Sequence, residues 1–267
     1  MNFDIFLRKE LKELLKNFRG IVLLAVFLFT AVSAPIMARF TPDILMWAFN
    51  AMDEPTDMSA FIGLFGEPSS VSGFTQFFSD FTTLGLFAFI IIFGGIVAKE
   101  KSKGTAAYIL TKSVSRTEFI LSKFVASVLF IFAATAVTAG VLKLASFIIF
   151  NDGLIHVQDF ILYFALLFLY LVFIMSIIMF ASVIAKSTTP ATIFSFLIFA
   201  AFNIWAMIPR AGRFAPPNIN NLNVLANDLN TLNAHNSTDL TVGIILTVAF
   251  SICFLISSIA LFNRQEL

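Results

Sequence analysis

Charge is scarce in this sequence. Only 12% of its 267 residues are charged and 59% are hydrophobic, whereas soluble proteins average about 25% charged residues. This balance excludes a water-soluble fold. The single cysteine, Cys253, excludes an internal disulfide. The two histidines, His156 and His235, have no second ligand at metal-binding spacing, so we interpret them as ordinary surface residues.

Chemically active motifs are also missing. The phosphate-binding pattern G-x-x-x-x-G-K-[ST] does not occur, so the chain is not expected to hold ATP or another cofactor by itself. The long apolar runs contain no Asp, Glu or His, and the nearest carboxylate, Glu118, stands at the inner mouth of the third run. Proton-coupled pumps and intramembrane metallohydrolases depend on such residues. We therefore predict that the chain is not an enzyme and binds no metal, and that active transport would need energy from a partner.

Long hydrophobic runs are abundant. Six can be marked, at residues 21–38, 81–98, 119–150, 160–184, 190–208 and 240–262. Each reaches or approaches the roughly 20 residues that a helix needs to cross a bilayer. The sequence therefore predicts an all-α integral membrane protein with six transmembrane helices, forming a single domain over residues 1–267.

Residues 1–20 have a different pattern. Apolar side chains recur at helical spacing between Phe3 and Phe18, and basic residues occupy the other faces. This pattern predicts an amphipathic elbow helix on the inner leaflet. A signal peptide is the alternative, since residues 32–34 resemble a cleavage site, but Pro35 directly afterwards argues against cleavage.

The distribution of Lys and Arg predicts the orientation. With a cytoplasmic N-terminus, 13 basic residues fall on the inner side and only three, Arg39, Arg210 and Arg213, on the outer side. Basic residues accumulate on the cytoplasmic side of membrane proteins. Both termini are therefore expected in the cytoplasm, and the predicted location is a prokaryotic plasma membrane.

The connections carry further signals. We predict a long outer loop at residues 39–80, with short helices at residues 44–49 and 61–65. Thr189 and Pro190 form a helix N-cap and first helical position, so a helix is expected to begin there. Small residues at Gly94 and Gly95 permit close helix approach.

The third apolar run contains two features with open interpretations. Ala136 and Gly140 are spaced for close helix contact, and we favour packing inside the bundle over a dimer seam. Lys143 is the only charge well inside a run, which makes it a possible intramembrane polar site. The alternative is that its ammonium reaches toward the outer headgroups along its own alkyl chain.

Residues 98–124 form the longest charged segment between two apolar runs. The segment opens on Lys99, Glu100, Lys101 and Lys103, and breaks at Gly104. The tetrapeptide 115–118, Ser-Arg-Thr-Glu, has the capping-box pattern, in which a Ser hydroxyl and a Glu carboxylate satisfy the free N–H groups of a helix start. A helix is therefore predicted to begin near Arg116.

This segment resembles the inner loop of ATP-binding-cassette (ABC) transporter permeases of the type-2 exporter class. The matching positions are Glu100, Gly104, Thr105, Ser113, Val114, Ser115, Arg116, Ser122 and Lys123. The basic first helix, residues 38–40, residues 209–210 and the last four residues extend the resemblance over most of the chain. Ser113 departs from the family pattern, which commonly has proline there.

The resemblance implies a half-transporter. Two such permeases, in a homodimer or heterodimer, would form the path, and two separate ATPase subunits would bind ATP beneath them. A short coupling helix after Gly104 would contact the ATPase, and Gly104 would permit the turn near its start. The implied coupling residues are Glu100, Lys103, Gly104, Thr105, Ser115 and Arg116, with Glu100 and Arg116 forming salt bridges either to the partner or within the loop. For any one of these charges, solvation beside anionic lipids is the simpler interpretation.

Other functions remain open from the residues alone. An ATP-independent carrier or channel, a membrane-embedded enzyme, and a structural or sensory subunit are the alternatives. Nothing in the sequence identifies a substrate, and no nucleic-acid partner is expected.

Overall fold

The computed structural model describes residues 3–50, 68–106, 115–150, 157–220 and 237–265. Within these ranges the chain is helical and contains no strand, which confirms the all-α class. Six helical stretches are long and apolar enough to cross a membrane, as the hydrophobic runs predicted.

The six stretches are built from nine helical elements and are connected in chain order. They are α2 (Phe18–Asn50); a broken stretch of α4 (Ser70–Asp80), the π-helix η1 (Phe81–Gly85), α5 (Leu86–Phe93) and α6 (Ala98–Ser102); α8 (Arg116–Phe150); α9 (Val157–Ile184); α10 (Thr188–Ala206); and α12 (Ser237–Arg264). A separate helix, α1 (Phe3–Lys16), precedes them, and two 3₁₀ turns, η2 (Gly212–Phe214) and η3 (Pro216–Asn220), follow α10.

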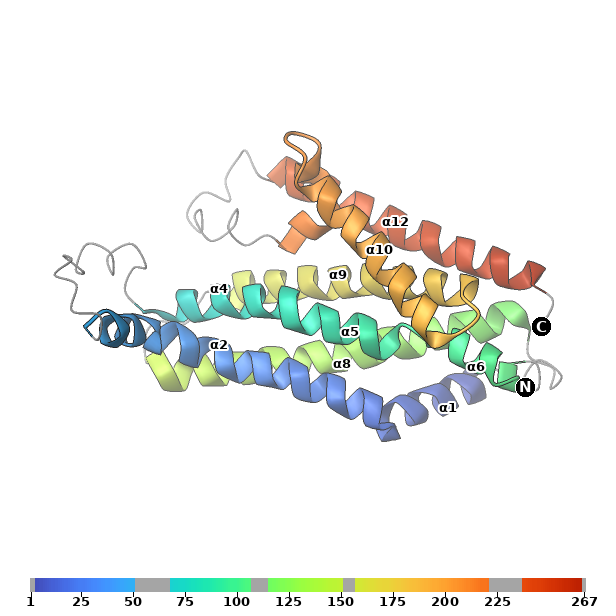
Figure 1. The fold of residues 1–267 in the computed structure, drawn as a ribbon, viewed down its shortest axis with the longest axis horizontal. Helices are drawn as coiled ribbons and strands as arrows, with labels where there is room; N and C mark the ends of the chain where they lie inside the picture. The colour runs from blue at the N-terminus through green and yellow to red at the C-terminus, as the bar shows by residue number, and fades with distance from the viewer. Residues whose placement is uncertain (1–2, 51–67, 107–114, 151–156, 221–236, 266–267) are drawn as a thin grey trace.

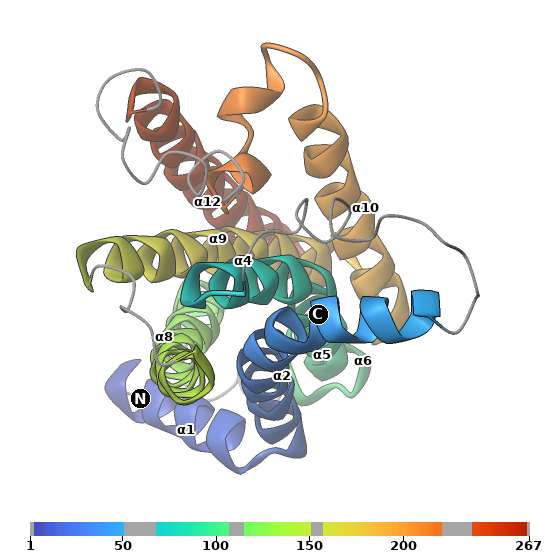
Figure 2. The ribbon, with the colours of Figure 1, turned by 90° about the vertical axis from the view of Figure 1, so that its left-hand side faces the viewer.

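Helix α9 is the centre of the bundle. Figure 2 shows α2, the α4–α5 stretch and α8 on one side of α9, and α10 and α12 on the other. The sequence of α9 is apolar on every face, and residues such as Leu167, Phe173 and Ile178 are fully buried. A helix that is hydrophobic all round has to be buried among other elements, which explains its position.

Aromatic rings fill much of the space between α2, α4 and α9. The ring centroids of Phe27 and Phe81 lie 4.6 Å apart, and those of Phe74 and Tyr163 lie 5.3 Å apart with their edges facing. Such tilted contacts are the favoured geometry for aromatic pairs. They hold the broken second stretch against both neighbours.

The predicted bounds of the connection at residues 39–80 are wrong at both ends, although residues 44–49 are helical as predicted. Helix α2 continues through Pro42 to Asn50, and α4 already begins at Ser70. The early start has a local cause, because the backbone N–H groups and hydroxyls of Ser69 and Ser72 form a reciprocal capping box. The predicted helix at 61–65 lies outside the described residues.

Helix α10 also begins earlier than predicted. Its N-cap is Ser187 and its first residue is Thr188, so Pro190 occupies the third helical position instead of the first. Proline is tolerated there because the first four N–H groups of a helix have no intrahelical acceptor. The helix ends at Ala206, two residues before the end of the predicted run at 208.

The two small residues of the third run that are spaced for close helix contact do not pack inside the bundle. Ala136 and Gly140 are exposed on α8, and a Cβ built on Gly140 meets nothing within 4 Å. The preferred interpretation of these residues is therefore wrong for this chain. Gly94 and Gly95, in contrast, do lie against a helix: a Cβ on Gly95 would approach Cγ2 of Thr188 to 2.0 Å.

The two ends of the bundle differ in composition. Figure 1 places α1, α6, the start of α8 and the end of α12 at the same end, together with both termini. We call this the charged end, because it carries the basic residues of α1, α6 and the start of α8. The end where α2 finishes and α4 begins is called the opposite end.

Candidate functional site at the charged end

A buried lysine is the centre of the charged end. Helix α8 begins at Arg116, as predicted, with Ser115 and Glu118 forming the expected capping box. Lys123 follows about two turns later. Its Nζ lies 2.8 Å from Oε2 of Glu10 on α1 and 2.6 Å from Oε1 of Glu100 on α6.

We call these three residues the Lys123 triad. The side chain of Lys123 is only 2% exposed, and that of Glu10 only 6%. A buried ammonium is strongly unfavourable unless it is paired and hydrogen-bonded. The triad meets this requirement with two carboxylates, and it joins three segments that are distant in the sequence.

The triad contains more acceptors than its lysine can satisfy. Oε1 of Glu10 and Oε2 of Glu100 are buried, and neither has a hydrogen-bond partner in the described part of the chain. The nearest additional cation is Lys9, whose Nζ lies 3.8 Å from Oε1 of Glu10. Lys123 and Lys9 together balance the charge of the two carboxylates, but these two oxygens still lack a hydrogen-bond donor among the described residues.

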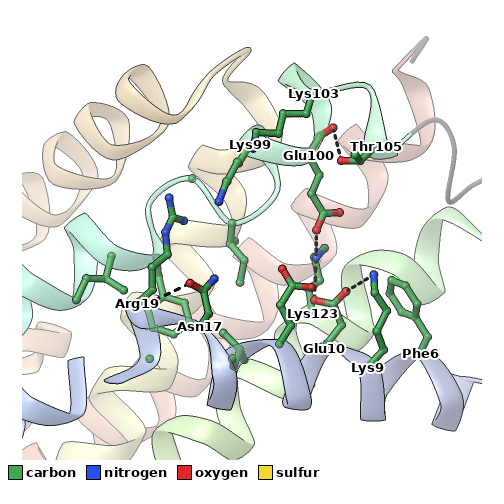
Figure 3. A pocket seen from close by; sticks show the side chains of 17 residues that line it. Phe6, Lys9, Glu10, Asn17, Arg19, Lys99, Glu100, Lys103, Thr105 and Lys123 are labelled. Atoms are coloured by element: carbon green, nitrogen blue, oxygen red, sulfur yellow. Dashed lines mark hydrogen bonds and ion pairs between the residues drawn. The ribbon is translucent and has the colours of Figure 1, made fainter. Parts of the chain in front are cut away.

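A cavity of about 560 Å³ lies beside the triad, between α1, the start of α2, the end of α5, and α6. Its apolar wall includes Leu14, Ile92 and Phe93. Figure 3 shows Arg19 and Lys99 on one side of this cavity and Glu10, Glu100 and Lys123 on the other. The cavity therefore has a basic side, an acidic side and an apolar wall.

Helix α6 is fixed to the neighbouring helix α9 at its N-terminus. The hydroxyl oxygen of Ser182 accepts hydrogen bonds from the backbone N–H groups of Val97 and Ala98, each at 2.9 Å. Free N–H groups at a helix start need such acceptors. The short helix thus has one contact to α9 through Ser182 and another to α8 through Glu100.

The end of α12 is held by two basic side chains. Nη1 of Arg116 donates to the carbonyl oxygens of Phe262, Asn263 and Gln265, at 3.3, 3.0 and 2.5 Å. Nζ of Lys101 donates to the side-chain oxygen of Gln265 at 2.7 Å and to the carbonyl oxygen of Val183 at 2.6 Å. Cations at a helix C-terminus satisfy its free carbonyls and its dipole. These contacts, which we call the C-terminal anchor, join α12 to α6, α8 and α9.

Gly104 has the backbone conformation that a glycine allows. It follows Lys103, the C-cap of α6, and has a φ of +69°, in the left-handed region. A Cβ atom at this position would have no neighbour within 4 Å. Glycine is favoured at this position after a helix end. The glycine therefore permits a turn, as expected. The turn lies at the end of α6, however, and not at the start of the next helix, where we expected it.

The other predicted coupling residues lie in the Lys123 triad, in the C-terminal anchor or along the cavity. Glu100 belongs to the triad and Arg116 to the C-terminal anchor, so the contacts shown for both are within the chain. Lys103 and Thr105 line the cavity, and the Thr105 hydroxyl donates to the carbonyl oxygen of Glu100 at 3.1 Å. Residues 107–114, with most of the predicted coupling helix, lie outside the described residues.

Lys143 is not part of this site. It lies toward the other end of α8, where its Nζ stands 5.6 Å from the centre of the Phe160 ring. This is the geometry of a cation–π contact. Its side chain is half-buried.

Sequence reasoning missed the roles of Glu10 and Lys101 and the burial of Lys123. One signal was present, since Lys123 falls inside the apolar run 119–150, where a cation needs a nearby carboxylate. Nothing in the sequence distinguishes Glu10 from the other charged residues of the first helix. Its burial depends on how α1 packs against α8, which no local pattern specifies.

Comparison with protein families identifies where the chain belongs. Residues 37–267 match the family described as "Protein of unknown function (DUF2705)". The chain is a member of this family. No curated protein matches it. Among the described residues, no group of three His, Cys, Asp or Glu side chains is placed to hold a metal ion.

Proposed function

We propose that this DUF2705 chain is the membrane-spanning permease subunit of an ATP-driven ABC exporter. It would pair with a second permease, the same or different, and associate with two ATPase subunits that bind ATP. Helix α1 would be the elbow helix on the inner leaflet, and the charged end would face the cytoplasm. The resemblance of residues 98–124 to type-2 permeases is the main support for the family.

The observation that carries the coupling proposal is the Lys123 triad. Glu10 and Glu100 bring α1 and α6 against one ammonium on α8. A force on the segment after Gly104 would therefore move α1, α6 and the start of α8 together. Packed helices that move as a unit are a common element of switching transitions.

The C-terminal anchor extends this unit to the other side of α9. Arg116 and Lys101 tie the end of α12 to the same segment. ATP-driven closure of the partner subunits would thus act on both halves of the bundle. A shift between inward-facing and outward-facing packings would follow as a population shift between two rigid arrangements.

The direct test uses the full chain, tagged and isolated from its native membrane in mild detergent. We expect an ABC ATPase to co-purify and to show vanadate-sensitive ATP hydrolysis. Lys103→Glu and Gly104→Pro should reduce this association or the hydrolysis without loss of membrane insertion. Lys186→Glu, at an exposed position in the α9–α10 turn, is the matched charge control and should keep both.

Two results would contradict the proposal. One is a native preparation that lacks an ABC ATPase. The other is solute movement in liposomes that contain this chain alone, because such movement indicates an ATP-independent carrier or channel.

A further inference from the structure

The cavity at the charged end combines three chemical surfaces that together suit one kind of ligand. The basic surface consists of Arg19, Lys99 and Lys103. Within the described residues, none of these three lies within ion-pair distance of a carboxylate. A group of unpaired cations around a cavity favours an anionic group, and a phosphate suits both guanidinium and ammonium donors.

The acidic surface of the cavity lacks hydrogen-bond donors. Oε1 of Glu10 and Oε2 of Glu100 are buried without a hydrogen-bond partner in the part of the chain that is described. Only 5% of the surface of Glu10 is exposed, and both Glu10 and Glu100 line the cavity. Buried carboxylate oxygens without donors are costly. A ligand that carries an ammonium group would supply the missing donors.

The third surface is apolar. Ile92, Phe93 and Ile96, near the end of α5, line the cavity. Phe18 and Ile21, at the start of α2 beside Arg19, are exposed. Arg and Lys near the ends of membrane helices are the usual contacts of lipid headgroups. The volume of about 560 Å³ also falls within the range of ordinary ligand sites, roughly 300–1,000 Å³.

We propose that this cavity binds the headgroup of a phospholipid that carries both a phosphate and a primary ammonium, as in phosphatidylethanolamine. The phosphate contacts Arg19, Lys99 and Lys103, and the ammonium donates to the free oxygens of Glu10 and Glu100. An acyl chain lies against Ile92, Phe93 and Ile96. This site does not depend on an ATPase partner, so it can be tested separately from the proposed function.

The lipid chemistry separates this proposal from a general attraction to anionic membranes. Phosphatidylcholine has the same phosphate but a quaternary ammonium that cannot donate hydrogen bonds. Phosphatidylglycerol has the phosphate but no cation. A site built only from the basic surface would therefore prefer phosphatidylglycerol, whereas the complete site prefers phosphatidylethanolamine.

The experiment is native mass spectrometry of the purified full chain, after exchange into micelles that contain equal amounts of the three lipids. We expect phosphatidylethanolamine to be retained about tenfold more than phosphatidylcholine, since each charged hydrogen bond contributes of the order of one power of ten in affinity. The double variant Arg19→Gln/Lys99→Gln should lose this retention. Lys186→Gln should keep it.

A second variant tests the acidic surface. Glu100→Gln retains a side-chain oxygen that can accept from Lys123, but it removes the charge that attracts an ammonium. We expect it to reduce the preference for phosphatidylethanolamine over phosphatidylcholine, with an unchanged elution profile in size-exclusion chromatography as the check on folding.

Soluble probes distinguish a lipid from a free phosphate compound. Inorganic phosphate and phosphoethanolamine are added at millimolar concentration, and the retained lipid is measured again. Phosphoethanolamine should compete more strongly than inorganic phosphate. Equal retention of all three lipids, a preference for phosphatidylglycerol, or binding of inorganic phosphate without lipid retention would each overturn the proposal.

Discussion

Helix α8 carries a lysine toward each end, and the two are accommodated in different ways. At the charged end, Lys123 is 2% exposed and lies between two carboxylates. Toward the opposite end, Lys143 is half-buried and its ammonium stands over the ring of Phe160. The first arrangement needs partners from two other segments, whereas the second needs one ring from the neighbouring helix.

This difference indicates what each end of the bundle is built to do. A lysine that extends along apolar surface can keep its charge near the membrane boundary and needs little from the fold. A buried lysine with two buried carboxylates fixes the positions of all the segments that carry them. We therefore regard the charged end as a rigid unit and the opposite end of α8 as more tolerant of change.

The largest expected effect comes from removing the buried ammonium. Lys123→Met leaves Glu10 and Glu100 buried as two like charges, and breaking a buried ion pair in this way costs about 3–5 kcal/mol. Lys143→Met is the matched control, and we expect only a small change. The measurement is the thermal unfolding midpoint of the purified chain in detergent. Equal midpoint shifts for the two variants would remove the distinction between the ends.

A second pair of variants compares helix packing at the two ends. In Gly95→Ala the new methyl group would lie 2.0 Å from Cγ2 of Thr188, so the turn between α5 and α6 must move away from the start of α10. Overpacking of this kind typically costs about 1–3 kcal/mol. Gly140→Ala meets nothing within 4 Å, and alanine favours a helix interior by up to about 1 kcal/mol.

The packing prediction is checked by the same unfolding assay. We expect a lower midpoint for Gly95→Ala and an unchanged or higher one for Gly140→Ala. If Gly140→Ala were the more damaging change, the exposed face of α8 would be in contact with another chain in the purified protein.

The sequence predicted the elements better than the site. The six apolar runs, the helix start at Arg116 and the need for glycine at 104 follow from hydropathy, a capping pattern and backbone sterics, which are all local. The predicted end of the first helix at residue 38 and the predicted packing of Ala136 inside the bundle were wrong. Local turn and spacing rules do not include tertiary contacts. The triad could not be predicted for the same reason, since Glu10, Glu100 and Lys123 meet only after three helices pack.

The third prediction concerns the C-terminal anchor. Arg116→Ala removes three hydrogen bonds to carbonyl oxygens at the end of α12, and we expect a loss of about 2 kcal/mol because hydrogen bonds from charged groups are the stronger ones. Hydrogen–deuterium exchange should increase in the last turns of α12. Arg264→Ala, at an exposed neighbouring position, should leave exchange unchanged. If both variants behaved alike, the anchor would not depend on Arg116.

The smallest expected effect is at the start of α8. Ser115→Ala removes the hydroxyl that accepts from the Glu118 N–H, and N-cap losses of this kind act on the first turn of a helix. We expect faster hydrogen–deuterium exchange in residues 116–119 and little change elsewhere. A change that also reached α1 would mean that the cap and the Lys123 triad are coupled.

The most direct test of the triad is a neutral replacement of all three members. Lys123→Met is combined with Glu10→Gln and Glu100→Gln, and the unfolding midpoint is compared with that of Lys123→Met alone. If Lys123 stabilises the charged end by neutralising two buried carboxylates, the triple variant should recover a large part of the lost stability. A triple variant as unstable as Lys123→Met, or less stable, would contradict this account.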